Sequence, residues 1–269
     1  MRIARSESIA THALLLLASV VAVFPLASIV VTSLQGTAGS SQGASFANYS
    51  RAWTQGRFGP ALLSSALVSV TVVAVTVVLA SLAGYALATM RVPGGKVVLG
   101  LLLLGLVLPY EITVLPLYEL LAGWHLIDTY WALILPQIAL SIPLGVLWMR
   151  SFFASVPVEL MEAARIDGTS RLQTLCLVVL PVARPALTTL GTVLFLFTWN
   201  EFLLALILVP NNASVQTVPL ALSFFSGAAR SSDPAVTAAA AVLVALPVLL
   251  AYVFLQRQLI SGLTEGAVK

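Results

Sequence analysis

Few side chains in this sequence have the types and spacing that enzymes use for covalent or metal chemistry. His12 and His125 are far apart, and neither has a neighbouring Cys or second His, as a metal site would need. Gly94, Gly95 and Lys96 lack the spacing and the following Ser or Thr of a phosphate-binding loop. The sequence therefore predicts no catalytic residue, no metal site and no nucleotide-binding loop on this chain.

Two isolated reactive side chains have simple structural interpretations. Cys176 is the single cysteine, so it has no partner for an internal disulfide, and it lies in an apolar run. We expect it to be a small buried hydrophobic residue rather than a redox or metal site. His125 lies in the aromatic stretch GWHLIDTYW, which is typical of the interfacial belt of a membrane protein rather than of a catalyst.

A polar stretch, residues 162–181, lies between two long hydrophobic segments. Pro157 suits the first turn of a helix, Glu159 and Glu162 suit its N-terminal half, and Gly168 can supply a left-handed stop. A second helix can start at Thr169 or Ser170. The spacing alone leaves two interpretations open, a hairpin that merely joins two spans and a surface that another protein binds.

One further polar pair, Asn200 and Glu201, interrupts an otherwise apolar segment. An ionisable group at membrane depth is by default a candidate functional site. The two residues are therefore a candidate substrate path. The alternative is that Glu201 pairs with a polar neighbour on a partner subunit and fixes subunit packing.

The composition places these residues in a membrane protein. Of 269 residues, 59% are hydrophobic and only 9% are charged, and the formal net charge is +3. A soluble domain carries roughly a quarter charged residues, so the chain belongs in a bilayer. The small, dispersed positive charge argues against nucleic acid as a partner.

A bilayer core of about 30 Å needs about 20 apolar residues in a helix, and six stretches meet this requirement. They are residues 13–34, 61–88, 97–114, 130–152, 182–209 and 235–255. The first is longer than the apolar core of a signal peptide and is interrupted by Pro25, so we expect a retained anchor.

The distribution of Lys and Arg predicts the orientation. With both termini in the cytoplasm, the inner segments hold 10 of the 13 basic residues and the outer segments hold 3. Basic residues collect on the cytoplasmic side. This orientation places residues 162–181 in the cytoplasm.

The remaining segments complete an all-α membrane protein with six transmembrane helices. Residues 35–60 suit an external loop with a short helix, and residues 115–126 suit a short helix at or re-entering the outer surface. We divide the chain into residues 1–57 (tail, first anchor helix and external loop), 58–257 (the main membrane domain) and 258–269 (a cytoplasmic tail).

The polar stretch resembles a known signature. The string EAA at residues 162–164, followed by Gly168, Val178 and the pair Leu180-Pro181, is similar to the EAA motif of binding-protein-dependent ABC importer permeases. The family usually has Ile where this chain has Val178. Because so many positions match at fixed spacing, the resemblance favours a docking segment over a mere connector.

Four further segments resemble the carbohydrate-uptake branch of that family, and within it the maltose-type second permease. They are LPYEITVLPLYELL, HLIDTYWALILP, TWNEFLLAL and GLTEGAVK. The resemblance implies a type I importer fold with a cytoplasmic EAA coupling helix. It also implies four kinds of partner, namely a second permease, two ATP-binding cassette ATPase subunits, an extracytoplasmic solute-binding protein and membrane lipid.

The resemblance further implies which residues act. The residues that would couple to the ATPase are Glu162, Ala163, Ala164, Arg165, Asp167, Gly168, Leu180 and Pro181. ATP and Mg²⁺ would be bound by the ATPase, so this chain would hold no cofactor and would not be an enzyme. The tail from Gly262 to Lys269 resembles one that the maltose-type permease inserts between its ATPase subunits.

Other functions remain as alternatives. A secondary transporter would show inverted repeats and paired intramembrane charges, and the sequence shows neither. A purely structural subunit would leave the EAA motif unexplained. Within the importer interpretation, a di- or oligosaccharide is the expected substrate, with glycerol phosphate or another polar solute as the alternative.

Overall fold

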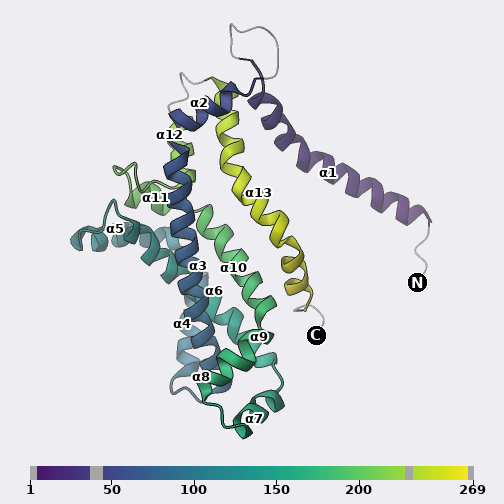
Figure 1. The fold of residues 1–269 in the computed structure, drawn as a ribbon, viewed down its shortest axis with the longest axis vertical. Helices are drawn as coiled ribbons and strands as arrows, with labels where there is room; N and C mark the ends of the chain where they lie inside the picture. Colours follow the sequence, from purple (N-terminus) through teal and green to yellow (C-terminus); the bar gives the residue numbers. More distant parts are fainter. Residues whose placement is uncertain (1–4, 37–44, 228–232, 266–269) are drawn as a thin grey trace. The chain divides into compact units, whose positions relative to one another are not determined.

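The computed structural model describes residues 5–36, 45–227 and 233–265, and all regular structure within these ranges is helical (Figure 1). The expected all-α class is confirmed. The chain divides into two compact units. The first joins Met1–Gly59 to Ala221–Pro247, and the second joins Pro60–Leu220 to Val248–Lys269.

In the first unit, a short helix is fastened to the end of a long one. Helix α1 is Arg5–Ser33 and helix α2 is Ala47–Gln55, the short helix expected in residues 35–60. The hydroxyl groups of Ser33 and Tyr49 are 2.7 Å apart, and Asn48 Nδ2 donates to the carbonyl oxygens of Ser33 and Gln35 at 2.9 and 2.8 Å. These bonds pair backbone carbonyls that the end of α1 leaves open.

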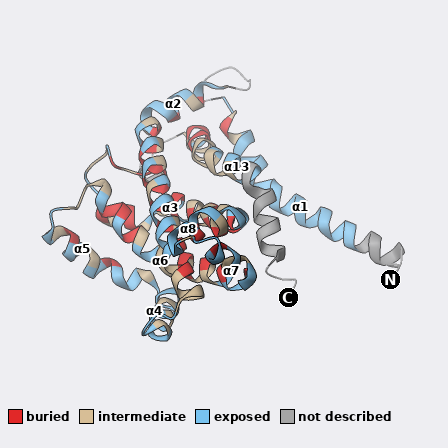
Figure 2. Ribbon diagram, turned by 60° about the horizontal axis from the view of Figure 1, so that its bottom comes forward, coloured by how far each residue is buried: buried red, intermediate tan, exposed pale blue. Residues whose placement is uncertain are grey.

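Helix α1 leaves most of its apolar side chains exposed. Its apolar stretch Thr11–Ser33 is long enough to cross a membrane, and none of its most hydrophobic window is buried (Figure 2). An apolar helix with this much exposed surface is stable only against lipid or another apolar protein surface. The expectation of a first membrane-spanning helix is met.

Three more helices are long and apolar enough to span by themselves among the residues described. They are Phe58–Thr89 (helix α3), Tyr130–Ser155 (helix α6) and Pro234–Val253, the first part of helix α13 (Pro234–Glu265). Two bent helix pairs bring the total to six if each pair is counted as one span. Six spans were predicted from the sequence.

The predicted third span, 97–114, is not one straight helix. Helix α4 covers Gly95–Val107, a 3₁₀ turn (η1) covers Tyr110–Thr113, and helix α5 covers Val114–Gly123, with a bend of 93°. Leu108 is extended because Pro109 follows it and disfavours the helical conformation there. The short helix expected over 115–126 is α5, which turns away from α4 in Figure 1.

The predicted fifth span, 182–209, is also interrupted. Helix α10 covers Arg184–Trp199 and helix α11 covers Leu203–Leu208. The amide of Asn200 donates to Leu196 O at 2.7 Å, and Glu201 Oε1 accepts the backbone N–H of Leu204 at 2.9 Å. These side chains pair with backbone groups at the break, and this allows the helix to stop inside an apolar segment.

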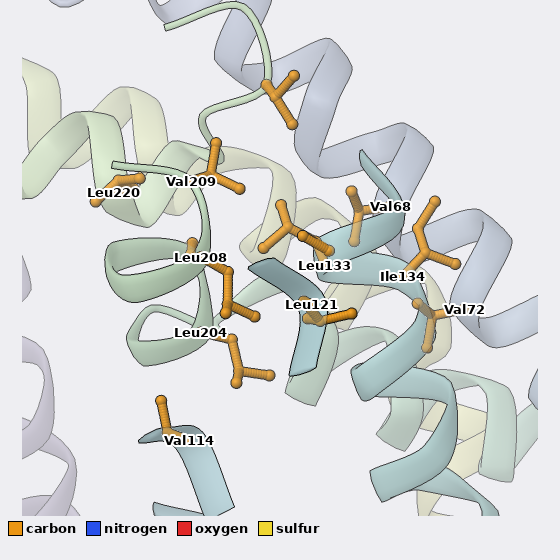
Figure 3. Packing of buried hydrophobic residues seen from close by; sticks show 13 residues of the cluster. Val68, Val72, Val114, Leu121, Leu133, Ile134, Leu204, Leu208, Val209 and Leu220 are labelled. Atoms are coloured by element: carbon orange, nitrogen blue, oxygen red, sulfur yellow. The ribbon is translucent and has the colours of Figure 1, made fainter. Parts of the chain in front are cut away.

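The second unit has two apolar cores. The first cluster joins α3, α5, α6 and α11 through residues such as Val68, Leu121, Leu133, Leu204 and Leu208 (Figure 3). The second joins α3, α6 and α10 to the helical segments at residues 158–182. Helix α6 contributes to both cores, so it positions the two ends of the unit relative to each other.

Small residues let α3 and α6 approach closely. A Cβ atom on Gly84 would lie 2.8 Å from the backbone nitrogen of Arg150 and 2.9 Å from the Cβ of Met149. A Cβ atom on Gly145 would lie 2.9 Å from the Cβ of Ala80. Such small-residue contacts are a main source of helix association in membranes.

We predict that Gly84→Ala and Gly145→Ala each lower the thermal unfolding midpoint of the purified protein in detergent. Overpacking of this kind costs about 1–3 kcal/mol. The matched control is Gly100→Ala on α4, where an added Cβ meets nothing within 4 Å. An alanine there should leave the midpoint unchanged or raised, since helical glycine is less favourable than alanine. Equal midpoints in all three variants would contradict close α3–α6 packing.

Candidate functional site

The polar stretch and the residues that flank it form a hairpin of two helical segments, which we call the coupling hairpin (residues 158–182). Helix α7 covers Val158–Ile166, with Glu159 in its first turn and Arg165 in its last. Gly168 follows with φ +77°, the left-handed conformation predicted for it. Its N–H donates to Arg165 O at 3.0 Å, while Asp167 N donates to Ala163 O at 3.0 Å. The predicted C-terminal stop is confirmed.

The second segment begins at Ser170, as expected. The Ser170 hydroxyl accepts the N–H of Gln173 at 3.4 Å, and Gln173 Oε1 accepts the N–H of Ser170 at 2.8 Å. This reciprocal capping box satisfies two donors at the helix start. Thr169 Oγ1 donates to Ala164 O at 2.7 Å, so the turn between the two segments is also held by side chains.

The structure places most of the predicted docking residues on the outside of the hairpin. Those exposed are Glu162, Ala163, Arg165, Asp167 and Gly168. Ala164 differs, since it is only 5% exposed and packs against its own chain. The small Ala164 side chain therefore allows α7 to lie close to its own chain, and only Ala163 presents a small side chain outward.

Five large apolar side chains of the hairpin are exposed, and none of them was singled out from the sequence, namely Val158, Ile166, Leu172, Leu177 and Val182. Ile166 is 86% exposed at the end of α7, and Leu172 is 61% exposed on the second segment. The sequence pattern that could have identified them is a large aliphatic side chain inside a polar, capped stretch. Together with Ala163, Glu162 and Arg165 they give the hairpin an exposed surface of apolar and charged side chains. Exposed apolar groups rimmed by polar residues mark sites of protein interaction.

Leu180 and Pro181 lie at the far end of the hairpin. Leu180 is half-buried against the second core, and Pro181 is exposed. Pro181 does not end a helix. It occupies the first turn of a short helix, α9 (Leu180–Val182), and the chain then bends by 80° into α10. Proline is tolerated there because first-turn N–H groups need no helical partner.

Cys176 is exposed, so the prediction of a buried side chain was wrong. It lies on a π-helical segment, η2 (Thr174–Val179), between α8 (Arg171–Gln173) and α9. Thr174, Leu175 and Val179 are the residues of η2 that face inward. The wider π-helical turn shifts which residues face the core, and this shift cannot be read from an apolar run.

A cavity of 310 Å³ lies beside helix α7. Its lining combines the ends of α3 and α6, through Thr89 and Phe153, with Met161, Glu162 and Arg165 of α7. Within the described chain no ion pair joins Glu162 to Arg165, and the residues of the pair are both exposed. Their charges are therefore available to another molecule.

Helix α10 connects the coupling hairpin to the polar break at residues 200–202. Its 16 residues correspond to about 24 Å of continuous helix. Trp148 Nε1 on α6 donates to Ala186 O near the start of α10 at 3.2 Å, which anchors that end. Helix α10 therefore links the end of the hairpin to Asn200 without a break in its own helix.

The break borders the larger of the two cavities described here, with a volume of 590 Å³. Its lining comes from α4, η1, α6, α10 and the break, and includes both Asn200 and Glu201. Glu201 Oε2 accepts a long hydrogen bond, 3.4 Å, from the Tyr110 hydroxyl. The structure thus brings the two predicted path residues together at one cavity and gives Glu201 a partner within its own chain.

Four polar residues of this cavity were missed from the sequence, namely Tyr110, Gln137, Ser141 and Thr198. Gln137 is only 5% exposed, and its Oε1 has no hydrogen-bond partner. An amide inside the apolar run of α6 was the available signal, but its direction depends on helix packing.

The comparison with protein families gives a clear result. Residues 76–264 match the family described as the binding-protein-dependent transport system inner membrane component. The expectation from the EAA motif is confirmed.

Individual relatives carry names from sugar transport. The trehalose transport system permease protein SugB of Mycobacterium tuberculosis is 35% identical over 61% of this chain and 60% of that protein. The diacetylchitobiose uptake system permease protein DasC of Streptomyces coelicolor is 37% identical over 60% of this chain and 58% of its own length. The chain thus matches about three fifths of the length of such curated relatives.

The fold has a solved counterpart. One chain of a bacterial ABC transporter involved in the import of the acidic polysaccharide alginate aligns with a TM-score of 0.78 and 22% identity. The alignment covers 96% of this chain and 99% of that one, and at this identity it speaks for the fold alone. Together with the family match over most of the sequence, it confirms the predicted type I importer permease architecture. The chain belongs to the family of inner membrane components of binding-protein-dependent transport systems.

Proposed function

We propose that this chain is the transmembrane permease subunit of an ATP-driven, binding-protein-dependent sugar importer. The observation that carries the proposal is the coupling hairpin, a capped and exposed helix whose sequence matches the EAA motif in a chain of this family. A connector needs neither a capping box nor exposed apolar residues at its tip. The proposed role is transport, with ATP hydrolysis on a separate subunit.

The partners follow from this role. Two ATPase subunits would bind ATP and Mg²⁺ on the cytoplasmic side, and a solute-binding protein would deliver the substrate outside. A second permease would complete the pathway and could cover α1, whose most hydrophobic window is not buried on this chain. The names of the relatives, which refer to trehalose and diacetylchitobiose, support a di- or oligosaccharide as the substrate.

The proposed coupling is mechanical. Helix α7 docks on an ATPase through Glu162, Ala163 and Ile166, and Gly168 permits the sharp turn that presents the end of the helix. The second core fixes the hairpin to α6 and α10. Because α10 is continuous up to Trp199, movement of the hairpin is delivered to the cavity at Glu201.

We predict that Gly168→Val abolishes substrate uptake while membrane insertion is preserved. Valine strains the left-handed backbone at this position by about 1–3 kcal/mol, although a Cβ there would meet nothing within 4 Å. The matched control is Gly168→Asn, because asparagine tolerates this conformation. Uptake in proteoliposomes, together with ATPase co-purification, measures the effect. Equal loss in both variants would show that backbone conformation is not the cause.

A second substitution tests the docking surface. Glu162→Lys should weaken ATPase binding or uncouple it, because it reverses the charge that we propose faces a basic group. Glu162→Gln, which removes the charge without reversing it, should lose less. If Gly168→Val and Glu162→Lys both transport at the wild-type rate with the ATPase normally bound, the hairpin is only a connector.

The proposed orientation places both termini and the coupling hairpin in the cytoplasm, and it rests on the 10-to-3 distribution of basic residues. In a Cys176→Ser background, an impermeant thiol reagent added to spheroplasts should label Ser214→Cys but not Ser155→Cys. Both side chains are exposed in the structure. Permeabilised cells should label both. The reverse pattern in intact spheroplasts would overturn the orientation.

The C-terminal tail provides a further test. Helix α13 continues to Glu265, beyond the predicted end of the sixth span, and the last four residues lie outside the described part of the chain. We predict that truncation after Leu263 lowers transport-coupled ATPase activity while the complex still assembles. Full coupled activity in the truncated complex would mean that the tail makes no functional contact with the ATPase.

A further inference from the structure

The 590 Å³ cavity holds a negative charge without a compensating cation. Glu201 is the one carboxylate among the residues that line it, all of which the structure describes, and the lining contains no Lys, Arg or His. Its volume lies in the range of about 300–1,000 Å³ that is typical of small-molecule sites.

The segments that build the cavity extend this charge bias. Helices α4, α6 and α10 each carry one basic residue toward the end away from the cavity lining, namely Lys96, Arg150 and Arg184. Apart from these helix ends, residues 97–149 and 185–229 contain four carboxylates and no Lys or Arg. The four are Glu111, Glu119, Asp128 and Glu201. An anionic solute entering this region would lose hydration without gaining a cationic partner, which is strongly unfavourable.

Gln137 supplies an independent sign of a ligand. Gln137 lines the cavity and is only 5% exposed. Its Oε1 accepts no hydrogen bond within the chain. A buried carbonyl oxygen without a donor is costly, so the site is suited to an occupant that brings one. A hydroxyl group is such a donor.

The rest of the lining suits the apolar face of a sugar ring. Aliphatic side chains such as Leu106, Leu140 and Leu194 face the cavity, together with Phe197, which is 63% exposed. Pyranose rings present apolar C–H faces and polar hydroxyl edges. The cavity offers both kinds of surface, with Tyr110 and Ser141 as further hydroxyl partners.

We infer that this cavity is a subsite for an uncharged polyol, the size of a mono- or disaccharide, and that it selects against anionic solutes. Gln137 and Glu201 hydrogen-bond hydroxyl groups, and the carboxylate of Glu201 excludes sugar phosphates and uronates. The inference rests on the proposed importer function and narrows it, since it favours a neutral sugar over glycerol phosphate.

The charge selection is tested without transport. The full importer complex is purified with Ser141→Cys introduced in a Cys176→Ser background. The new thiol is treated in separate samples with a cationic and an anionic methanethiosulfonate of similar size. The rate of labelling of this chain is measured by mass spectrometry. After correction for reaction with a free thiol, the cationic reagent should react faster. Glu201→Gln should reduce that preference about fivefold. Ser214→Cys, outside the cavity lining, should show no such change. An unchanged preference at Ser141→Cys overturns the inference.

The polyol specificity is tested by uptake into proteoliposomes with the complete complex. A panel of neutral sugars, sugar phosphates and uronates first identifies the substrate. If it is a neutral sugar, Gln137→Leu should raise the KM about tenfold while ATPase stimulation by the binding protein persists. The KM of Gln137→Asn, which keeps an amide, should lie between the values of that variant and wild type.

Wild-type uptake of an anionic solute, or an unchanged KM in Gln137→Leu, overturns the inference and leaves the importer role standing. ATP-driven uptake of no solute at all refutes the proposed function instead, and the labelling result then decides the charge selection alone.

Discussion

The arrangement of the second unit depends on one constraint, that a backbone N–H or C=O group in an apolar environment must have a hydrogen-bond partner. Two helices in this unit stop inside apolar segments, at Pro109 and at Asn200. At the second break the side chains of Asn200 and Glu201 pair with backbone groups of Leu196 and Leu204. The same carboxylate reaches Tyr110 beside the first break. The two interruptions therefore meet, and the larger cavity lies where they meet.

The same constraint explains why the coupling hairpin can be rigid although it is exposed. Water can satisfy a frayed helix end, so exposure alone would permit a loose segment. Instead Ser170 and Gln173 cap one helix start reciprocally, and Thr169 pairs with the last turn of α7. The ordered ends keep the orientation of the hairpin relative to α10. In the proposed coupling, these ordered ends would let a force applied at α7 reach the cavity instead of being absorbed by the turn.

The chain also presents surfaces that its own fold leaves uncovered. Helix α1 buries none of its most hydrophobic window, and Ile166 and Leu172 extend from the hairpin with more than half of their surface exposed. The first surface is predominantly apolar, which suits lipid or a membrane-embedded partner. The second is mixed with carboxylates, which suits a water-soluble protein surface. These different chemistries are consistent with a subunit that meets two kinds of environment.

The sequence by itself determined the features that depend on local hydrogen bonding and on hydrophobicity. Helix α7, the left-handed Gly168 and the start at Ser170 follow from residues within one or two turns, and the membrane class and family follow from composition and the EAA motif. Tertiary structure decided which face each residue presents. It buried Ala164, exposed Cys176 and placed Tyr110 beside Glu201, 91 positions apart. The breaks within the third and fifth predicted spans were also missed. The mean hydropathy of about 20 residues is hardly changed by one proline, such as Pro109, or by one carboxylate that accepts a nearby backbone N–H, such as Glu201. Contacts between distant helices depend on packing geometry, which no local pattern encodes.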